Sequence, residues 1–224
     1  MILNPSRVIF TIATLVSLSV TAHAQVTVTV DRNFGALATK DFKFKLVKPP
    51  VKDDAGAKAK LTLLVGEIDP AGGDLSALTD GLLPTEENEP KSNFSFDSGS
   101  SGGRFSMDFG SVIEIKQINT YSWHSSTRAP QVYMLYASDG TGPNFCAEPN
   151  AEIDPSSCGW KLITDVDTRR KRGDGGGQYA VSISEARGSL GKYRYLLFRC
   201  SATETEDDSG NTFFSEIDVI AKKQ

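Results

Sequence analysis

The sequence predicts an all-β protein built as an antiparallel, jelly-roll-like β-sandwich. Apolar and polar residues alternate in many short segments, which is the period of a strand with one buried and one wet face. Glycine, proline and Asp-Gly turns separate these segments, and no convincing long amphipathic helix pattern is present. Many short strands joined by such turns are typical of sandwiches, and about eight strands would complete a jelly roll.

Six segments show the alternation most clearly. In the first, Val26, Val28 and Val30 alternate with threonines. The other five place their apolar residues at Phe42, Phe44 and Leu46; Phe94 and Phe96; Phe105, Met107 and Phe109; Val132, Met134 and Tyr136; and Tyr179, Val181 and Ile183. We expect each segment to be a half-buried strand.

Three further segments depart from this pattern. Residues 193–198 are apolar almost throughout, which predicts a central strand buried on both faces. Residues 53–60 and 72–78 are the densest helical candidates, and we expect each to supply a turn or two.

The chain shows no internal repeat, so we expect one sandwich domain over residues 51–224. Residues 25–50 end at a Pro-Pro break and form either a separate N-terminal β extension or part of the same domain.

The first 24 residues have the features of a secretory signal peptide. Arg7 precedes an uncharged apolar run over residues 8–20, and small residues stand at Ala22 and Ala24. That run is shorter than the roughly 20 residues needed to cross a bilayer. We therefore expect cleavage after Ala24 and an exported, periplasmic or extracellular protein whose mature chain has no transmembrane segment.

The net charge and the number of histidines argue against several classes of function for this chain. With 24 Lys and Arg against 28 Asp and Glu, the chain has a formal net charge of -4 and no global attraction for nucleic acid. Removal of the signal peptide would take away His23 and leave His124 as the sole histidine. This excludes zinc sites built on two histidines and leaves little support for a catalytic triad. We therefore predict a protein that is not an enzyme.

Three cysteines enter an oxidising compartment if the chain is exported. Cys146 and Cys158 bracket a loop rich in Pro, Asn, Asp and Ser, which a disulfide would stabilise by about 3 kcal/mol. Cys200 then stands alone at the end of an apolar run and is expected to be a buried small hydrophobe. Other pairings stay open.

From about residue 61 onward, the order of short motifs resembles the discoidin, or coagulation factor V/VIII type C, domains of the galactose-binding-like superfamily. The motifs are Asp80-Gly81, RFSMDFGSVIEIKQINTYSW, VYMLYASDG, Gly159-Trp160, and RYLLF followed by SEIDVIA. The phrases TYSWH and NTFFSEIDV resemble a set of uncharacterised exported bacterial proteins with this fold. Departures from the pattern are Phe109 in place of leucine, a long loop over residues 140–160, and the absence of the flanking cysteine pair, which argues against animal-type membrane-lipid binding.

The resemblance also implies a structural calcium ion. In sugar-binding members of the superfamily, the Asp of the Asp-Gly turn, neighbouring carbonyls and the glutamate of the last strand hold the ion. Carried over, the ligands are Asp80, the carbonyls of Ala77 and Leu82, an oxygen near Ser92, and Glu216. The alternative is that Asp80 caps its own turn. Asp69 and Asp74 lie in the same loop region and add carboxylates there.

A ligand site is predicted at Trp123, His124 and Arg128. A sugar offers an apolar face for an aromatic ring and hydroxyls for polar side chains, so a tryptophan beside His and Arg suits carbohydrate recognition. Two alternatives stay open: one in which Trp123 alternates into the core with Tyr121, and one in which Arg128 pairs with an acid. If Trp123 is inside, only His124 and Arg128 stay available.

These observations together predict a non-catalytic binding or adhesion module that recognises a cell-surface or extracellular glycan. The alternative is a structural or protein-interaction module of the cell envelope, and a hydrolase is the third candidate. Structural Ca²⁺ is the only cofactor expected.

Overall fold

The computed structural model describes residues 25–170, 175–204 and 210–222. Within these residues the protein is an antiparallel β-structure with short 3-10 turns, which confirms the predicted fold class. The strands are β1 (Val26–Asn33), β2 (Lys60–Val65), β3 (Gly102–His124), β4 (Val132–Ser138), β5 (Lys161–Asp167), β6 (Gly177–Glu185), β7 (Gly191–Ser201) and β8 (Phe214–Ala221). The 3-10 turns are η1 (Gly35–Leu37), η2 (Gly56–Lys58), η3 (Leu75–Leu78), η4 (Pro90–Ser92) and η5 (Pro155–Cys158).

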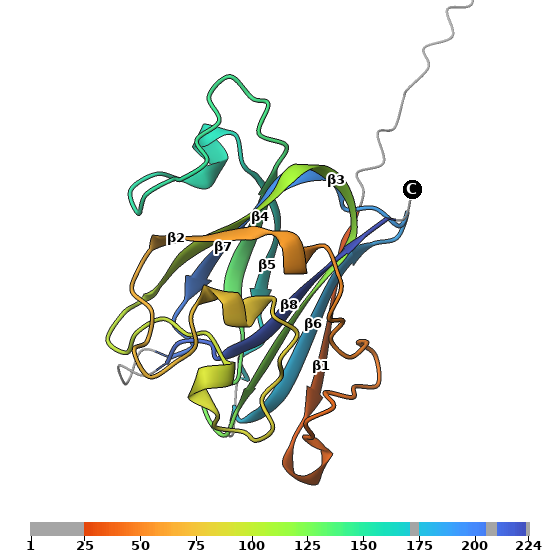
Figure 1. Ribbon diagram of the computed structural model, residues 1–224, viewed down its shortest axis with the longest axis vertical. Coiled ribbons are helices and arrows are strands. Elements are labelled where there is room, and N and C mark those ends of the chain that lie inside the picture. Colours follow the sequence, from red (N-terminus) through yellow and green to blue (C-terminus); the bar gives the residue numbers. More distant parts are fainter. Residues whose placement is uncertain (1–24, 171–174, 205–209, 223–224) are drawn as a thin grey trace, which may run out of the picture.

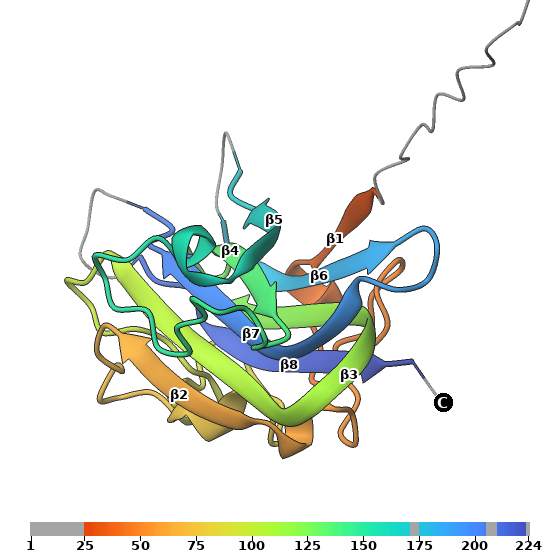
Figure 2. The same cartoon turned by 90° about the horizontal axis from the view of Figure 1, so that it is seen from above.

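The long strand β3 supplies both layers of the sandwich. Its first half pairs with β2 and β7, and its second half pairs with β6 and β8. Between the halves the register shifts from Asp108 to Ile113, and Gly110 takes a positive φ of 74° that favours glycine. The strand turns over at this point (Figure 2), so a layer ordered β5-β4-β7-β3-β2 faces one ordered β1-β6-β3-β8.

The main core lies between these two layers. The Phe105 and Phe198 rings stack with centroids 4.9 Å apart, and Phe94 and Phe214 close on Phe105 edge to face. These rings are at most 1% exposed. Burying aromatic rings of this size is a dominant source of stability, and it explains the alternation in β3, β4 and β6.

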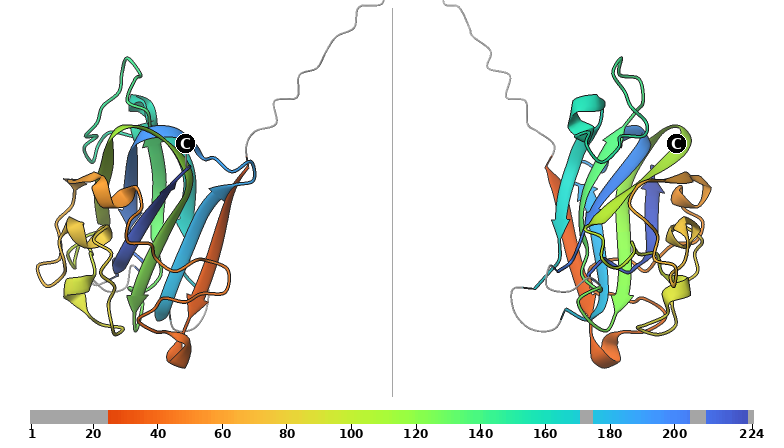
Figure 3. Two further views of the ribbon diagram at one scale, coloured as in Figure 1. Left: turned by 45° about the vertical axis from the view of Figure 1, so that its right-hand side comes forward. Right: turned by 90° about the vertical axis from the view of Figure 1, so that its left-hand side faces the viewer.

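The outer face of each layer is covered as well. Residues 34–58, which we call the strap, cross the four-stranded layer and form a second core there (Figure 3, left). Residues 139–160 cover the five-stranded layer, where Trp160 packs with Tyr136 and Leu197 in a third core (Figure 1).

Polar side chains on the outer face of the four-stranded layer hold the strap. Asn33 donates to the Lys43 carbonyl at 2.7 Å, and the Gln178 amide donates to the Thr39 carbonyl at 2.6 Å. The hydroxyl of Tyr121 donates to the Lys48 carbonyl at 2.7 Å. These side chains therefore satisfy backbone groups of the strap, which would otherwise be buried without partners.

Most of the strand predictions are confirmed. The alternating segments that begin at Val26, Phe105, Val132 and Tyr179 lie in β1, β3, β4 and β6. Residues 193–198 lie in β7, where Leu196, Leu197 and Phe198 are fully buried. The two helical candidates supply η2 and η3. Because β1 pairs with β6 along its whole length, residues 26–33 are built into the sandwich.

Two alternating segments do not form the predicted strands. Over residues 42–46 the backbone turns instead: Phe42 has a φ of 46°, and its N–H donates to the Thr39 carbonyl. Its ring is buried under the strap, while Leu46 is 72% exposed. Phe94 and Phe96 make only isolated bridges, to Phe214 and Ile68 respectively, and they lack the predicted wet face because residues 93–96 are all buried.

The expected disulfide is also absent from the structure. Cys146 and Cys158 are free thiols, and the Cys146 N–H donates to the Cys158 carbonyl at 3.1 Å. This bond, together with the one from the Trp160 indole to the Cys146 carbonyl at 2.8 Å, closes the loop in place of a covalent bridge. Cys200 is buried as predicted, and burial raises the pKa of its thiol.

The predicted signal peptide, residues 1–24, lies outside the described residues. Within the described ranges, none of the helices has the length and apolar character required to cross a membrane.

The strap gives the first testable prediction. Phe42→Ala removes a fully buried ring that packs edge to face on Trp123 at 5.6 Å and on Tyr121 at 6.3 Å. We expect the free energy of unfolding to fall by about 3–5 kcal/mol in urea titrations. Leu46→Ala is the matched control and should change it by less than about 0.5 kcal/mol. Equal effects of the two variants would show that the strap does not pack on the sheet as described.

Candidate functional site

The end of β3 presents His124 among the loops at one end of the sandwich. His124 is the last residue of β3 and is opposite Gly177 of β6. Its Nδ1 accepts a hydrogen bond from the Ser126 N–H at 3.1 Å, which places the proton of the neutral ring on Nε2. Burial, followed by the charge of Arg128, lowers the pKa of His124 to about 4. At neutral pH the side chain is therefore an uncharged donor held in one orientation.

Arg128 lies in the turn that follows and is held by three groups. Its Nη2 donates to Asp69 at 3.0 Å and to the Ser95 hydroxyl at 2.9 Å, while its Nε donates to the Asn211 carbonyl at 3.4 Å. Burial acts to raise the pKa of Asp69, but hydrogen bonds from Ala71 and Arg128 outweigh it and hold that pKa below its usual value. The alternative in which Arg128 pairs with an acid is thus confirmed.

Phe213 joins the two predicted ligand residues. Its ring lies 5.1 Å from the His124 ring, edge to face, and 4.7 Å from the centre of the Arg128 guanidinium. The Phe213 ring is 1% exposed, so it lies on the buried side of His124 and Arg128 and packs against both. We call His124, Arg128 and Phe213 the loop-end cluster.

Trp123 does not belong to this cluster. Its side chain lies on the opposite face of β3, is 5% exposed, and packs against Phe42 of the strap. The prediction that Trp123 offers a stacking face is therefore wrong, because successive residues of a strand point to opposite faces. Its indole Nε1 has no hydrogen-bond partner among the described residues.

Sequence reasoning missed Phe213 and Asp69 as parts of this cluster. Phe213 and Phe214 are adjacent aromatic residues, of which Phe214 enters the main core and Phe213 packs on His124. Two adjacent aromatic residues at a strand start were a signal that both faces are used there. Asp69 is distant in sequence from Arg128, so only the fold brings them together.

The loop-end cluster is poorly suited to general-base catalysis. In a catalytic triad a carboxylate orients the histidine and stabilises its charged form. Here His124 has Arg128 beside it, which acts in the opposite direction and lowers the pKa of the ring. Ser126 Oγ lies 3.1 Å from Nδ1, but an imidazole with so low a pKa is a weak base at neutral pH.

The predicted calcium ligands are partly brought together. The Gly81 N–H, in the Asp-Gly turn, donates to Glu216 Oε2 at 3.1 Å. Asp80 is exposed and its Oδ1 accepts from the Leu82 N–H at 2.7 Å, which is the turn-capping alternative. That bond involves only Oδ1, so the second carboxylate oxygen of Asp80 is available as a metal ligand.

The remaining predicted ligands are less suited to a metal. Ala77 is buried, Leu82 is 61% exposed, and the Ser92 hydroxyl donates to Glu89 at 2.9 Å. Asp74 caps η3 by accepting from the Ser76 N–H. Among the described residues, no three His, Cys, Asp or Glu side chains form a metal-binding group. The candidate donor set is thus limited to the carboxyl groups of Asp80 and Glu216 and main-chain carbonyls, which are oxygen ligands of the kind that Ca²⁺ accepts.

Two buried carboxyl groups lie next to each other on β8. Glu216 is 1% exposed and Asp218 is fully buried, both under the strap. Burial, then Asp218 and Asp80, raises the pKa of Glu216 to about 9. Burial and nearby Asp54 raise the pKa of Asp218 to about 7, although Val51 N–H and Tyr121 donate to it. A cation near Glu216 would favour its charged form.

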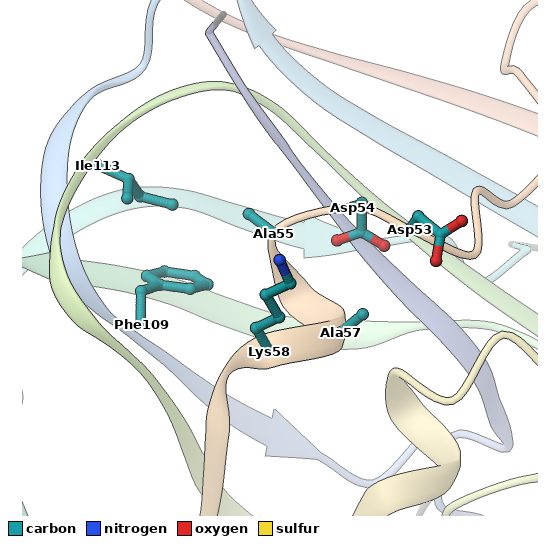
Figure 4. A pocket seen from close by; sticks show the side chains of 7 residues that line it. All are labelled: Asp53, Asp54, Ala55, Ala57, Lys58, Phe109 and Ile113. Atoms are coloured by element: carbon teal, nitrogen blue, oxygen red, sulfur yellow. The ribbon is translucent and has the colours of Figure 1, made fainter.

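A hollow of about 570 Å³ lies where the strap meets the bend of β3. Figure 4 shows Phe109 and Ile113 of β3 across from Ala55 and Lys58 of the strap, with Asp53 and Asp54 at one side. Asp54 is committed to the fold, since its Oδ1 accepts from the N–H groups of Gly56 and Val219. Neither His124 nor Arg128 lines this hollow, so it is distinct from the loop-end cluster.

Solved structures similar to this chain are carbohydrate-binding modules. They include the module CpGH89CBM32-4 of Clostridium perfringens, with 10% identity, a TM-score of 0.45, and coverage of 75% of this chain and 98% of that one. Chitosan-binding module 2 of a chitosanase/glucanase from Paenibacillus sp. IK-5, in complex with chitotriose, has 14% identity, a TM-score of 0.46, and coverage of 75% and 99%. A fucose-binding module of Streptococcus pneumoniae, SpX-3, has 11% identity, a TM-score of 0.45, and coverage of 76% and 99%.

At such low identities and TM-scores, the similarity concerns the arrangement of strands and gives no information about a ligand. No family model matches the chain, and no curated protein matches it.

The raised pKa values on β8 predict a pH dependence of stability. Because the folded-state pKa of Glu216 exceeds its unfolded value, its contribution is fully present below about pH 4 and is lost as pH rises through about 9. We expect Glu216→Gln to gain at least about 1 kcal/mol relative to the wild type between pH 5 and pH 9. Urea titrations in EDTA at both pH values measure this difference, with the exposed Glu152→Gln as control. An equal offset at both pH values would contradict the raised pKa.

Proposed function

We propose that this protein is an exported, non-catalytic module that binds a glycan through the loop-end cluster. The observation that carries the proposal is the convergence of His124 and Arg128 on the Phe213 ring, at 5.1 and 4.7 Å. Both polar side chains are held by hydrogen bonds, so little side-chain entropy is lost when a ligand binds.

The donors of the cluster suit sugar hydroxyls. Nε2 of His124 presents one N–H, and Arg128 presents the N–H groups that Asp69, Ser95 and Asn211 do not take. A surface of this kind supports shallow recognition of a chain end or an exposed ring, since a deep pocket would bury most of the ligand.

A protein-interaction role in the cell envelope is the alternative, and the strap is the feature that favours it. Phe34, Leu37, Leu46 and Val51 are each between 42% and 72% exposed. Exposed apolar side chains gathered on one segment are typical of protein interaction surfaces. Substitutions on the strap would weaken that interaction, whereas glycan binding depends on the loop-end cluster.

The glycan proposal is tested with the chain from Gln25 onward on a glycan array. We expect saturable binding, and we expect His124→Ala or Arg128→Ala to raise Kd at least about tenfold, because each loses a donor to the ligand. Lys192→Ala, which removes an exposed side chain of β7, is the control and should bind as the wild type does. Thermal melting of each variant separates lost binding from lost folding.

Two results would contradict this proposal. One is an absence of binding to every glycan together with capture of an envelope protein by the same chain. The other is glycan binding that folded His124→Ala and Arg128→Ala variants retain in full.

We also propose that Asp80 and Glu216, with the carbonyls of Ala77 and Leu82 and an oxygen near Ser92, hold a structural Ca²⁺. The contact between the Asp80-Gly81 turn and Glu216 supports this placement, as does the burial of two neighbouring carboxyl groups, Glu216 and Asp218, whose charged forms a cation would favour. The ion would supply the positive charge that this cluster of carboxyl groups lacks.

Added calcium tests this second proposal. Sites of extracellular modules bind Ca²⁺ with Kd values of about 0.1–1 mM, so about 10 mM CaCl2 should raise the Tm of the wild type. The rise should be absent in Glu216→Gln and in equal MgCl2. A Tm that calcium leaves unchanged, or raises equally in Glu216→Gln, would count against Asp80 and Glu216 as ligands.

A further inference from the structure

Two arginines lie directly opposite each other on the outer face of the five-stranded layer. Arg104 of β3 and Arg199 of β7 are partners in the antiparallel ladder between these strands. Like charges placed opposite each other in a sheet repel and destabilise it. Such an arrangement calls for a compensating negative charge.

Within the described residues, no ion pair supplies that charge. Arg104 is 4% exposed, and its guanidinium donates only to the carbonyls of Asn150, Ile153 and Ala151, at 2.6, 2.8 and 3.4 Å. Among the described residues, neither arginine forms an ion pair with a carboxylate. Burial, then the charge of Arg199, lowers the pKa of Arg104.

Asp154 lies near enough to act on Arg104 through its charge. It forms no ion pair with either arginine, however, and its Oδ1 caps η5 by accepting from the Ser156 N–H at 3.0 Å. The positive charge of the arginine pair is therefore only partly offset.

A hollow of about 230 Å³ is lined by both arginines. Ser101 and Ser201, both exposed, also line it, and none of its lining residues is acidic. A volume of this size holds a small ionic group or one substituent of a sugar, and it is too small for a whole oligosaccharide. In a chain with a net charge of -4, a lining with two arginines and no acid is a local reversal of sign.

We propose that this hollow binds an oxyanion group, a carboxylate or a sulfate, through Arg104 and Arg199. Guanidinium groups bind such oxyanions with paired, charge-assisted hydrogen bonds. Arg104 is fixed by the loop carbonyls and Arg199 is exposed and free to close on the ligand. The serine hydroxyls supply further donors at the rim.

This site is separate from the loop-end cluster and does not depend on it. The hollow is formed by the start of β3, the end of β7, Val65 of β2 and Ala151 of the covering loop, and none of the residues that line it belongs to the loop-end cluster. The two sites are neighbours, because Asn211 donates to the Ser100 carbonyl and accepts from Arg128. A glycan that carries acidic groups would offer a ligand of this class, and so would a free anion.

The test measures binding of sodium sulfate, glucuronate and N-acetylglucosamine 6-sulfate by calorimetry at constant ionic strength, with glucose as the neutral control. We expect saturable binding of at least one oxyanion, none of glucose, and a Kd at least about tenfold higher in Arg199→Gln. Arg199 is exposed, so its substitution should leave folding intact. Lys116→Gln removes the same charge from an exposed position of β3 and should bind as the wild type does.

The comparison of sulfate with glucuronate identifies the group that is bound, and the His124→Ala variant separates this site from the glycan site. Binding of sulfate alone would assign sulfate groups, and binding of glucuronate alone would assign carboxylates; both support the proposal. His124→Ala must leave oxyanion binding unchanged, whatever its effect on glycans. The proposal is overturned if no oxyanion binds, if glucose binds equally, or if Arg199→Gln and Lys116→Gln bind alike.

Discussion

A single strand, β3, is shared by both layers of the sandwich, and the rest of the structure depends on its bend. The first half of β3 is paired on both sides by β2 and β7, and the second half by β6 and β8. Since the chain is continuous through Gly110, the relative placement of the two layers is fixed by one turn of the backbone. The far end of the same strand carries His124, so the strand that builds the core also positions the loop-end cluster.

Both outer faces of the sandwich are covered, and this determines where a ligand can bind. The strap buries Tyr121 and Trp123 on one face, and residues 139–160 bury Tyr136 and Leu197 on the other. Charged groups beneath the covers are held by main-chain groups: Asp218 accepts from the Val51 N–H, and Arg104 donates to the loop carbonyls. The two proposed binding sites accordingly lie at the loop ends and in the hollow beside Arg104.

The sequence predicted the core strands because their alternation reports burial between two layers. The strand predictions failed where a segment outside the two layers, such as the strap, covers the outer face of a sheet. Phe42 and Leu46 alternate like a strand, yet one ring is buried in a turn and the other side chain faces water. For Trp123 the local pattern favours two outcomes, a ligand residue or a core residue that alternates with Tyr121, and the strap decides for the core by burying the ring. Arg128 and Asp69, or Arg104 and Arg199, meet only through strand pairing and loop packing, so their geometry is a product of the tertiary structure.

The central claim is that glycan recognition resides at the end of β3, on His124 and Arg128. NMR spectra of the ¹⁵N-labelled chain, titrated with a glycan that it binds, test this most directly because every amide reports separately. The account predicts that the largest shift changes fall on residues 124–128 and 211–213. Changes confined to the strap, with the amides of His124 and Arg128 unaffected, would contradict it.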